Sequence, residues 1–82
     1  MAWFDFLWTP ERTEHLAEHG VSPEDFEGVV LDPKAVGISR RSGRPMAYGY
    51  TSDGRYVACV YEMIDDVTAY PVTAYEVDEQ VH

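Results

Sequence analysis

The sequence predicts an α+β domain in which two amino-terminal helices pack on a three- to four-stranded antiparallel sheet. Two segments with helix-capping signals occupy the first third of the chain. From residue 36 onward, apolar residues recur with the period of two that is typical of strands. With 82 residues the chain is long enough for one hydrophobic core and too short for two, so residues 1–82 are expected to form a single domain.

The first helix is expected to run from Pro10 to about His19. Thr9 places a capping hydroxyl before it, and Pro10 takes the first helical position, where its missing N–H costs nothing. Gly20 suits the left-handed conformation in which helices often end. Leu16 is one of few apolar positions, so this helix is expected to bury only a thin stripe.

The second helix is expected to begin at Ser22-Pro23 by the same rules and to end at Asp32-Pro33. Asp25 stands where a capping box usually has glutamate. Spacings of three and four residues define the buried face of this helix, which consists of Phe26, Val29 and Val30.

Alternation of residues predicts three strands in the second half of the chain, over residues 44–51, 55–62 and 67–77. The hairpin signal Ser52-Asp53-Gly54 separates the first two strands, and Asp65-Asp66 separates the last two. Pro71 lies inside the last strand, which predicts either an edge position or a bulge. Further short strands are expected around residues 36–39 and 4–8.

The chain carries 6 Lys+Arg and 15 Asp+Glu, which gives a net charge of −9. A balance this acidic argues against a typical nucleic-acid binder, whose surface is basic. The charge is unevenly distributed, however: residues 1–33 carry −7, residues 34–55 carry +4 and residues 56–82 carry −6. A local site for a phosphate group is therefore compatible with the acidic total.

Three arginines lie within five residues between predicted strands, in the segment Ser39-Arg40-Arg41-Ser42-Gly43-Arg44. Arginine matches phosphate geometry with two parallel hydrogen bonds, and glycine lets backbone N–H groups approach an oxyanion. The segment is therefore a candidate phosphate-binding loop, with Arg40, Arg41 and Arg44 as its cations. The alternative is a solvated hairpin loop whose arginines pair with the acidic helices.

All six tyrosines lie on predicted strands, and Tyr48 and Tyr50 follow the arginine segment most closely. Tyrosine beside arginine on an exposed sheet face is a common way to stack single-stranded RNA bases. These two residues are therefore candidate RNA contacts. The alternative is a half-buried tyrosine whose hydroxyl reaches solvent.

His15 and His19 are four residues apart and share one face of the first helix. Such a pair could serve a metal-assisted hydrolase or metal-free acid–base catalysis near neutral pH. No third ligand follows at a suitable spacing and no phosphate-loop or dinucleotide fingerprint is present, so neither a metal nor a cofactor is expected. Cys59 lies in an apolar strand and is expected to be a buried, inert thiol.

Several short motifs occur in an order that extends over nearly the whole chain. They are His19-Gly20-Val21-Ser22, Gly43-Arg44, Gly54-Arg55 followed by Cys59-Val60-Tyr61, and Thr73-Ala74-Tyr75. In this order the chain resembles the BrnT family of toxins from type II toxin–antitoxin modules, which have a RelE-like fold. The resemblance implies metal-independent RNA cleavage and restraint by an antitoxin protein.

The resemblance also implies roles for individual residues. Arg44 and Arg55 match arginines of the family pattern, so they would stabilise the charge of the phosphorane that forms during cleavage. His19 matches the family histidine and would act as acid or base, and His15 is added by inference from its position on the same helix face.

The chain departs from the family pattern at three positions. Glu11 and Glu18 occupy helix positions that are usually lysine, and Tyr75 replaces the arginine of the last strand. The absence of these cations weakens phosphate binding. The alternative function is therefore a non-catalytic protein-interaction module of the same fold, whose acidic surface binds a basic partner.

A cytoplasmic location is expected. The apolar amino-terminal stretch is short, lacks basic residues and is interrupted by Asp5, which does not fit a signal peptide. No apolar run approaches the roughly 20 residues that a membrane helix needs. A lone cysteine fits a reducing compartment.

Overall fold

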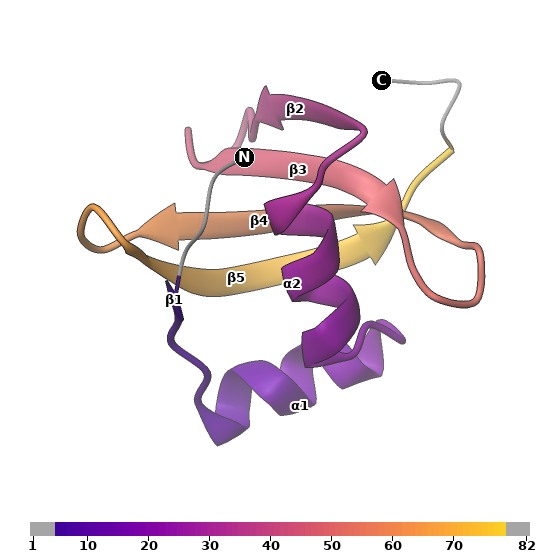
Figure 1. Cartoon of the computed structure of the whole chain (residues 1–82), viewed down its shortest axis with the longest axis horizontal. Helices are drawn as coiled ribbons and strands as arrows, with labels where there is room; N and C mark the ends of the chain where they lie inside the picture. Colours follow the sequence, from indigo (N-terminus) through magenta and orange to yellow (C-terminus); the bar gives the residue numbers. More distant parts are fainter. Residues whose placement is uncertain (1–4, 79–82) are drawn as a thin grey trace.

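The computed structural model describes residues 5–78, which form two helices and a five-stranded sheet (Figure 1). In chain order, the elements are β1 (Asp5–Phe6), α1 (Pro10–Glu18), α2 (Pro23–Leu31), β2 (Ala35–Ile38), β3 (Pro45–Tyr50), β4 (Tyr56–Met63) and β5 (Thr68–Glu76). The predicted α+β class is therefore confirmed. None of the helices within residues 5–78 has the length and apolar character that a membrane crossing requires.

The sheet has the strand order β1-β5-β4-β3-β2. Strands β2 to β5 form the predicted antiparallel meander, but β1 adds a fifth strand that runs parallel to β5. The sheet therefore has five strands rather than three or four: β1 lies in the region around residues 4–8 where a further short strand was expected, and it runs parallel to β5. The backbone hydrogen bonds that hold β1 include those from Asp5 N to Val67 O at 2.7 Å and from Leu7 N to Ala69 O at 2.9 Å. A strand of two residues carries no period in its sequence, so its pairing could not be predicted.

Both helices begin as predicted. Thr9 Oγ1 accepts a hydrogen bond from Arg12 N at 3.2 Å, and Ser22 Oγ accepts one from Asp25 N at 3.1 Å. The capping box expected for the second helix does not close in the usual way. The Asp25 carboxylate instead accepts a hydrogen bond from Ser52 N at 3.0 Å, which ties α2 to the β3–β4 turn.

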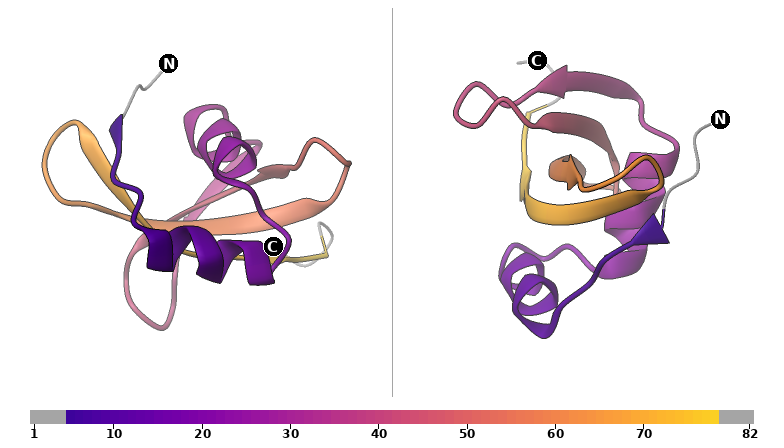
Figure 2. Two further views of the ribbon diagram at one scale, coloured as in Figure 1. Left: turned by 90° about the horizontal axis from the view of Figure 1, so that it is seen from below. Right: turned by 90° about the vertical axis from the view of Figure 1, so that its left-hand side faces the viewer.

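The hydrophobic core lies between α2 and one face of the sheet, which we call the helix face. Its buried side chains come from both helices, from the segment between them and from β3, β4 and β5, and comprise Leu16, Val21, Phe26, Val29, Val30, Ala47, Val57, Cys59 and Ala74. Helix α2 lies over this face, and α1 lies along β5 (Figure 2). The opposite face, which we call the open face, has a smaller cluster of Met46, Ala58 and Val60.

Strand β5 contains the irregularity that Pro71 predicts. The register between β4 and β5 shifts between Val60 and Tyr61, and Pro71 lies opposite Tyr61. As a result of this bulge, the consecutive residues Val72 and Thr73 both line the same pocket on the open face. The bulge therefore shapes the sheet at the site described below.

Helix α1 covers the edge of β5 that β1 leaves unpaired. Strand β1 pairs only with Thr68 and Ala69, and beyond these residues Arg12 Nη1 donates a hydrogen bond to Val72 O at 2.9 Å. Since unpaired strand edges tend to recruit other chains, this helix protects one side of the sheet.

Close packing of α2 on β3 requires glycine at position 49. A Cβ atom at Gly49 would lie 3.2 Å from both γ-carbons of Val29, whereas one at Gly37 would meet only the Tyr48 ring at 3.6 Å. We expect Gly49→Ala to be less stable than Gly37→Ala by about 1 kcal/mol, because α2 must shift to relieve the crowding. Urea unfolding of the two variants measures this difference. Equal free energies of unfolding for the two variants would contradict this expectation, because α2 would then move away from β3 without loss of stability.

Candidate functional site

The β2–β3 connection forms a compact loop, which we call the arginine loop (residues 39–44). Ser39 N donates to Arg44 O at 2.8 Å, and Gly43 N donates to Ser39 O at 2.7 Å. Gly43 has a φ of 73°, a left-handed conformation that glycine adopts without strain. These bonds hold the three arginines of the loop in one short hairpin connection.

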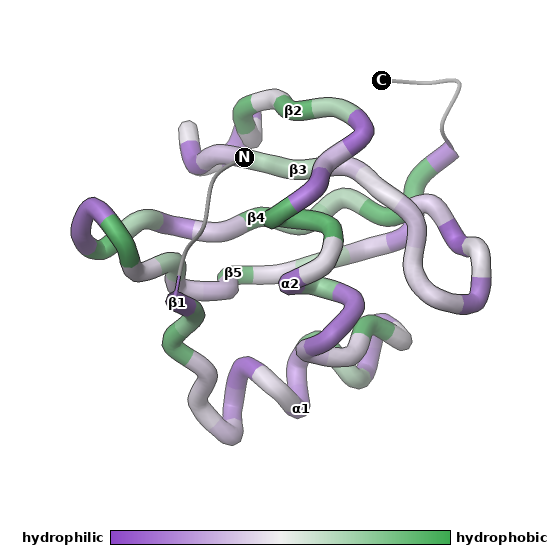
Figure 3. The backbone as a smooth tube through the Cα atoms, in the orientation of Figure 1, coloured by the Kyte–Doolittle hydropathy of each residue, from purple (hydrophilic) through white to green (hydrophobic). Residues whose placement is uncertain are grey.

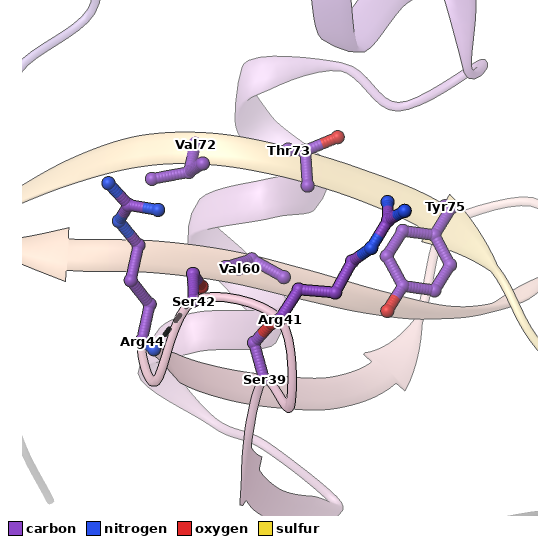
Figure 4. Close-up of a pocket in the computed structure, with 8 residues that line it drawn as sticks. All are labelled: Ser39, Arg41, Ser42, Arg44, Val60, Val72, Thr73 and Tyr75. Carbon is purple, nitrogen blue, oxygen red and sulfur yellow. Dashed lines mark hydrogen bonds between the residues drawn. The ribbon is translucent and has the colours of Figure 1, made fainter.

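The arginine loop overhangs the open face and encloses a pocket of about 390 Å³ with it (Figure 4). We call this the arginine pocket; it is lined by Ser39, Arg41, Ser42, Arg44, Val60, Val72, Thr73 and Tyr75. Its floor is the apolar surface of β4 and β5, and its sides carry two guanidinium groups and several hydroxyls. A phosphate group could thus bind the guanidiniums while an apolar base or sugar edge lies on the floor.

A second hollow of about 300 Å³ adjoins the arginine pocket and shares three of its residues. It is lined by Ile38, Ser39, Arg40, Arg41, Met46, Tyr48 and Tyr75. Four of the residues predicted for phosphate or RNA contact therefore come together around the loop, namely Arg40, Arg41, Arg44 and Tyr48.

The cations of the loop differ in their ion pairs. Arg44 Nε lies 2.7 Å from Glu62 Oε1 in a half-exposed pair. Arg40 and Arg41 are exposed, and neither forms an ion pair or hydrogen bond with another residue of the described range 5–78. The structure therefore does not show the alternative prediction, in which the arginines of the loop pair with acidic residues of the two helices. Two guanidinium groups therefore remain available to an anion.

Tyrosine rings extend along the open face beside the loop. Tyr48 and Tyr56 stack with their ring centroids 6.2 Å apart and 13° between their planes, and Tyr50 lies 4.9 Å from Tyr56. Tyr50 is exposed but does not line either pocket of the arginine loop. Tyr75 lines both pockets and is 39% exposed.

Arg55 lies away from the arginine pocket. It precedes β4, whereas Arg44 pairs with Glu62 near the other end of that strand, so the two arginines are roughly 20 Å apart at the usual rise per residue. Arg55 Nε contacts Asp53 Oδ2 at 3.0 Å, and Nη2 donates a hydrogen bond to the carbonyl of Gly20. Arg55 therefore joins the β3–β4 turn to the end of α1.

The two histidines contact each other on α1. Their ring centroids are 5.3 Å apart, and His15 Nε2 lies 3.1 Å from Thr73 Oγ1. The Thr73 hydroxyl is directed away from Arg41 and Arg44, although Thr73 also lines the arginine pocket (Figure 4). His15 and His19 are thus separated from Arg41 and Arg44 by β5, whereas Arg55 reaches the carbonyl of Gly20, the residue that follows His19.

Cys59 and possible metal ligands were the other candidates for chemistry in the sequence. Cys59 is buried as predicted, and burial raises the pKa of its thiol to about 12, which keeps it protonated and unreactive. Within residues 5–78, no three His, Cys, Asp or Glu side chains come together as a possible metal site.

Several contributors to this region were not predicted from the sequence, including Val72, Thr73 and Glu62. Val72 and Thr73 enter the pocket because of the bulge, and Glu62 pairs with Arg44. Pro71 was the one available signal, since a proline inside a strand marks the place where the sheet changes direction.

Comparison with protein-family models, with curated proteins and with solved structures finds no significant match for this chain.

The Arg55 contacts predict a pH-dependent contribution to stability. The pKa of Asp53 lies below its usual value of 3.8, because its carboxylate accepts a hydrogen bond from Thr51 and lies beside Arg55. A lowered pKa in the folded state stabilises the fold above pH 3.8, and this contribution is lost as the pH falls through the lowered value. We therefore expect Arg55→Ala to have a lower free energy of unfolding than wild type at neutral pH. This difference in free energy should become smaller below pH 3.8.

The matched control is Arg44→Ala, which removes an exposed ion pair and should lower the free energy of unfolding by at most about 1 kcal/mol. Arg55→Ala should cost more, because the Gly20 carbonyl is also left without its hydrogen-bond donor. Urea unfolding at neutral pH and at a series of acidic pH values measures both differences. A constant Arg55→Ala effect at all pH values would contradict the role assigned to Asp53.

Proposed function

We propose that this chain is an RNA-binding domain related to the BrnT toxins, and that it holds backbone phosphates at the arginine loop. The observation that carries the proposal is the pair Arg40 and Arg41, which are exposed above adjoining hollows and have no ion-pair partner within residues 5–78. Phosphate neutralisation by arginine supplies much of the affinity of proteins for nucleic acids.

The surroundings of the loop favour RNA over a small anion. Tyr48 and Tyr75 line the hollow next to the arginines and could stack on unpaired bases. The apolar floor of Val60 and Val72 offers a further surface for a base or ribose. Single-stranded RNA combines spaced phosphates with exposed rings, and this region offers partners for both.

Cleavage receives less support than binding. Metal-free cleavage requires a base near the attacking ribose hydroxyl and cations at the same phosphate. Arg41 and Arg44 could supply the cations, but His15 faces Thr73 on the α1 side of β5. We therefore propose RNA binding as the function and treat cleavage as the outcome that a separate experiment decides.

Removal of the two unpaired arginines should weaken RNA binding. We expect Arg40→Ala/Arg41→Ala to lower the affinity for a fluorescent single-stranded RNA by about tenfold or more at low salt. The slope of log affinity against log salt should fall by about 0.7 for each RNA phosphate that the variant no longer neutralises. Fluorescence anisotropy over a salt series measures both quantities.

Lys34→Ala is the matched control, because it removes one positive charge that lines neither pocket. It should leave most of the affinity intact. If Lys34→Ala and the double variant lower the affinity equally for each charge removed, binding would depend on net charge alone and the proposed site would be wrong.

The histidine geometry predicts that RNA remains intact. We expect wild-type protein, incubated with RNA at low salt in the presence of EDTA, to bind RNA without producing fragments, and His15→Ala to behave in the same way. Gel analysis of end-labelled RNA tests this expectation. Fragments that form with wild type but not with Arg44→Ala or His15→Ala would replace the binding proposal with a metal-independent ribonuclease.

A further inference from the structure

Strand β2 forms the edge of the sheet opposite to α1. Among residues 5–78 it pairs with β3 alone, and its side chains Val36 and Ile38 are 72% and 69% exposed. Natural sheets usually protect such edges with charges, prolines or bulges inside the strand. Ala35–Ile38 contains none of these, whereas the other edge of the sheet is covered by β1 and α1.

The backbone of β2 has groups that point away from the sheet. Ser39 N donates to Arg44 O, so in this antiparallel register Ala35, Gly37 and Ser39 direct their backbone groups to β3. The N–H and C=O groups of Val36 and Ile38 consequently point outward. Pro45 lies opposite Ile38, at a position where β3 needs no N–H donor, which agrees with this alternation.

The charges around this edge define what could pair with it. Lys34 lies before the strand, and Arg40 and Arg41 follow it, whereas the chain as a whole carries −9. The hydropathy colouring shows the apolar stretch of β2 next to a hydrophilic segment at its start (Figure 3). A complementary strand would therefore have acidic ends and an apolar, β-branched centre.

A second copy of the chain fits this edge less well. Antiparallel pairing of two β2 strands would bring Lys34 of one copy beside Arg40 of the other, and like charges in adjacent strands are destabilising. An acidic strand from a different protein would meet opposite charges at the same places.

We propose that the free edge of β2 captures an extended acidic segment of a partner protein, which adds to the sheet as a further strand through the backbone groups of Val36 and Ile38. Strand addition of this kind takes its affinity from main-chain hydrogen bonds and its specificity from alternate side chains. The proposal does not require RNA binding, because the main-chain groups of the strand edge carry it, although Arg40 and Arg41 lie next to both surfaces.

The test uses the full chain and a fluorescein-labelled valine–glutamate peptide, which has a central run of valines and glutamates at both ends; the valine–lysine control peptide has lysines in place of the glutamates. Wild type should bind the valine–glutamate peptide, and Val36→Pro should bind it about tenfold more weakly, because proline removes an outward N–H and none of the β2–β3 hydrogen bonds. Lys34→Glu should also weaken binding, and a valine–lysine peptide should not bind. Circular dichroism confirms that each variant is folded, and retained RNA binding by Val36→Pro separates this site from the arginine pocket.

Three results would overturn the proposal. One is equal binding of the valine–glutamate peptide by wild type and folded Val36→Pro. The second is equal binding of the glutamate and lysine peptides. The third is a wild-type dimer that Val36→Pro converts to monomer, measured by analytical ultracentrifugation in the absence of peptide, because the occupant would then be a second copy.

Discussion

The packing of α2 on one face of the sheet is the interaction on which the rest of the structure depends. Phe26, Val29 and Val30 fill the space above β3 and β4, and Gly49 lets the helix approach closely. The described part of the chain has only two helices of nine residues each, and one of them, α1, packs along β5. The other face of the sheet is consequently left without a helix. It is covered by tyrosine rings, small apolar residues and the overhanging arginine loop.

The separation between the helix face and the open face of the sheet also explains how an acidic chain can carry a basic site. The acidic residues of the first third lie mainly on α1 and α2, and the positive loop projects over the opposite, open face. At physiological ionic strength exposed charges more than about 8 Å apart are largely screened from each other. An anion above Arg40 and Arg41 therefore responds mainly to the loop and to the nearby Glu62. If the proposed RNA binding holds, the net charge of −9 should slow the approach of RNA more than it weakens the local contacts.

Local signals in the sequence were sufficient for most of the fold, and long-range contacts decided most of the site. Capping residues and the change of period predicted both helices and strands β2 to β5 to within about two residues, because these signals act between neighbours along the chain. The arginine loop was recognisable for the same reason. The distance between Arg55 and Arg44 could not be predicted in this way, because the partner of Arg55, the carbonyl of Gly20, lies 35 residues earlier. The partner of His15 lies 58 residues later, and no spacing rule reaches that far.

The two proposed interactions meet at the arginine loop. Arg40 and Arg41 line the hollows of the open face, and they also follow directly on the β2 edge. An acidic strand bound along Val36 and Ile38 would bring its carboxylates to the guanidinium groups that we assign to RNA phosphate. Arginine cannot satisfy both anions fully, so the two ligands should compete even though they bind different surfaces. Because Arg40 and Arg41 have no ion-pair partner within residues 5–78, they would link the proposed RNA binding to the proposed capture of a partner strand.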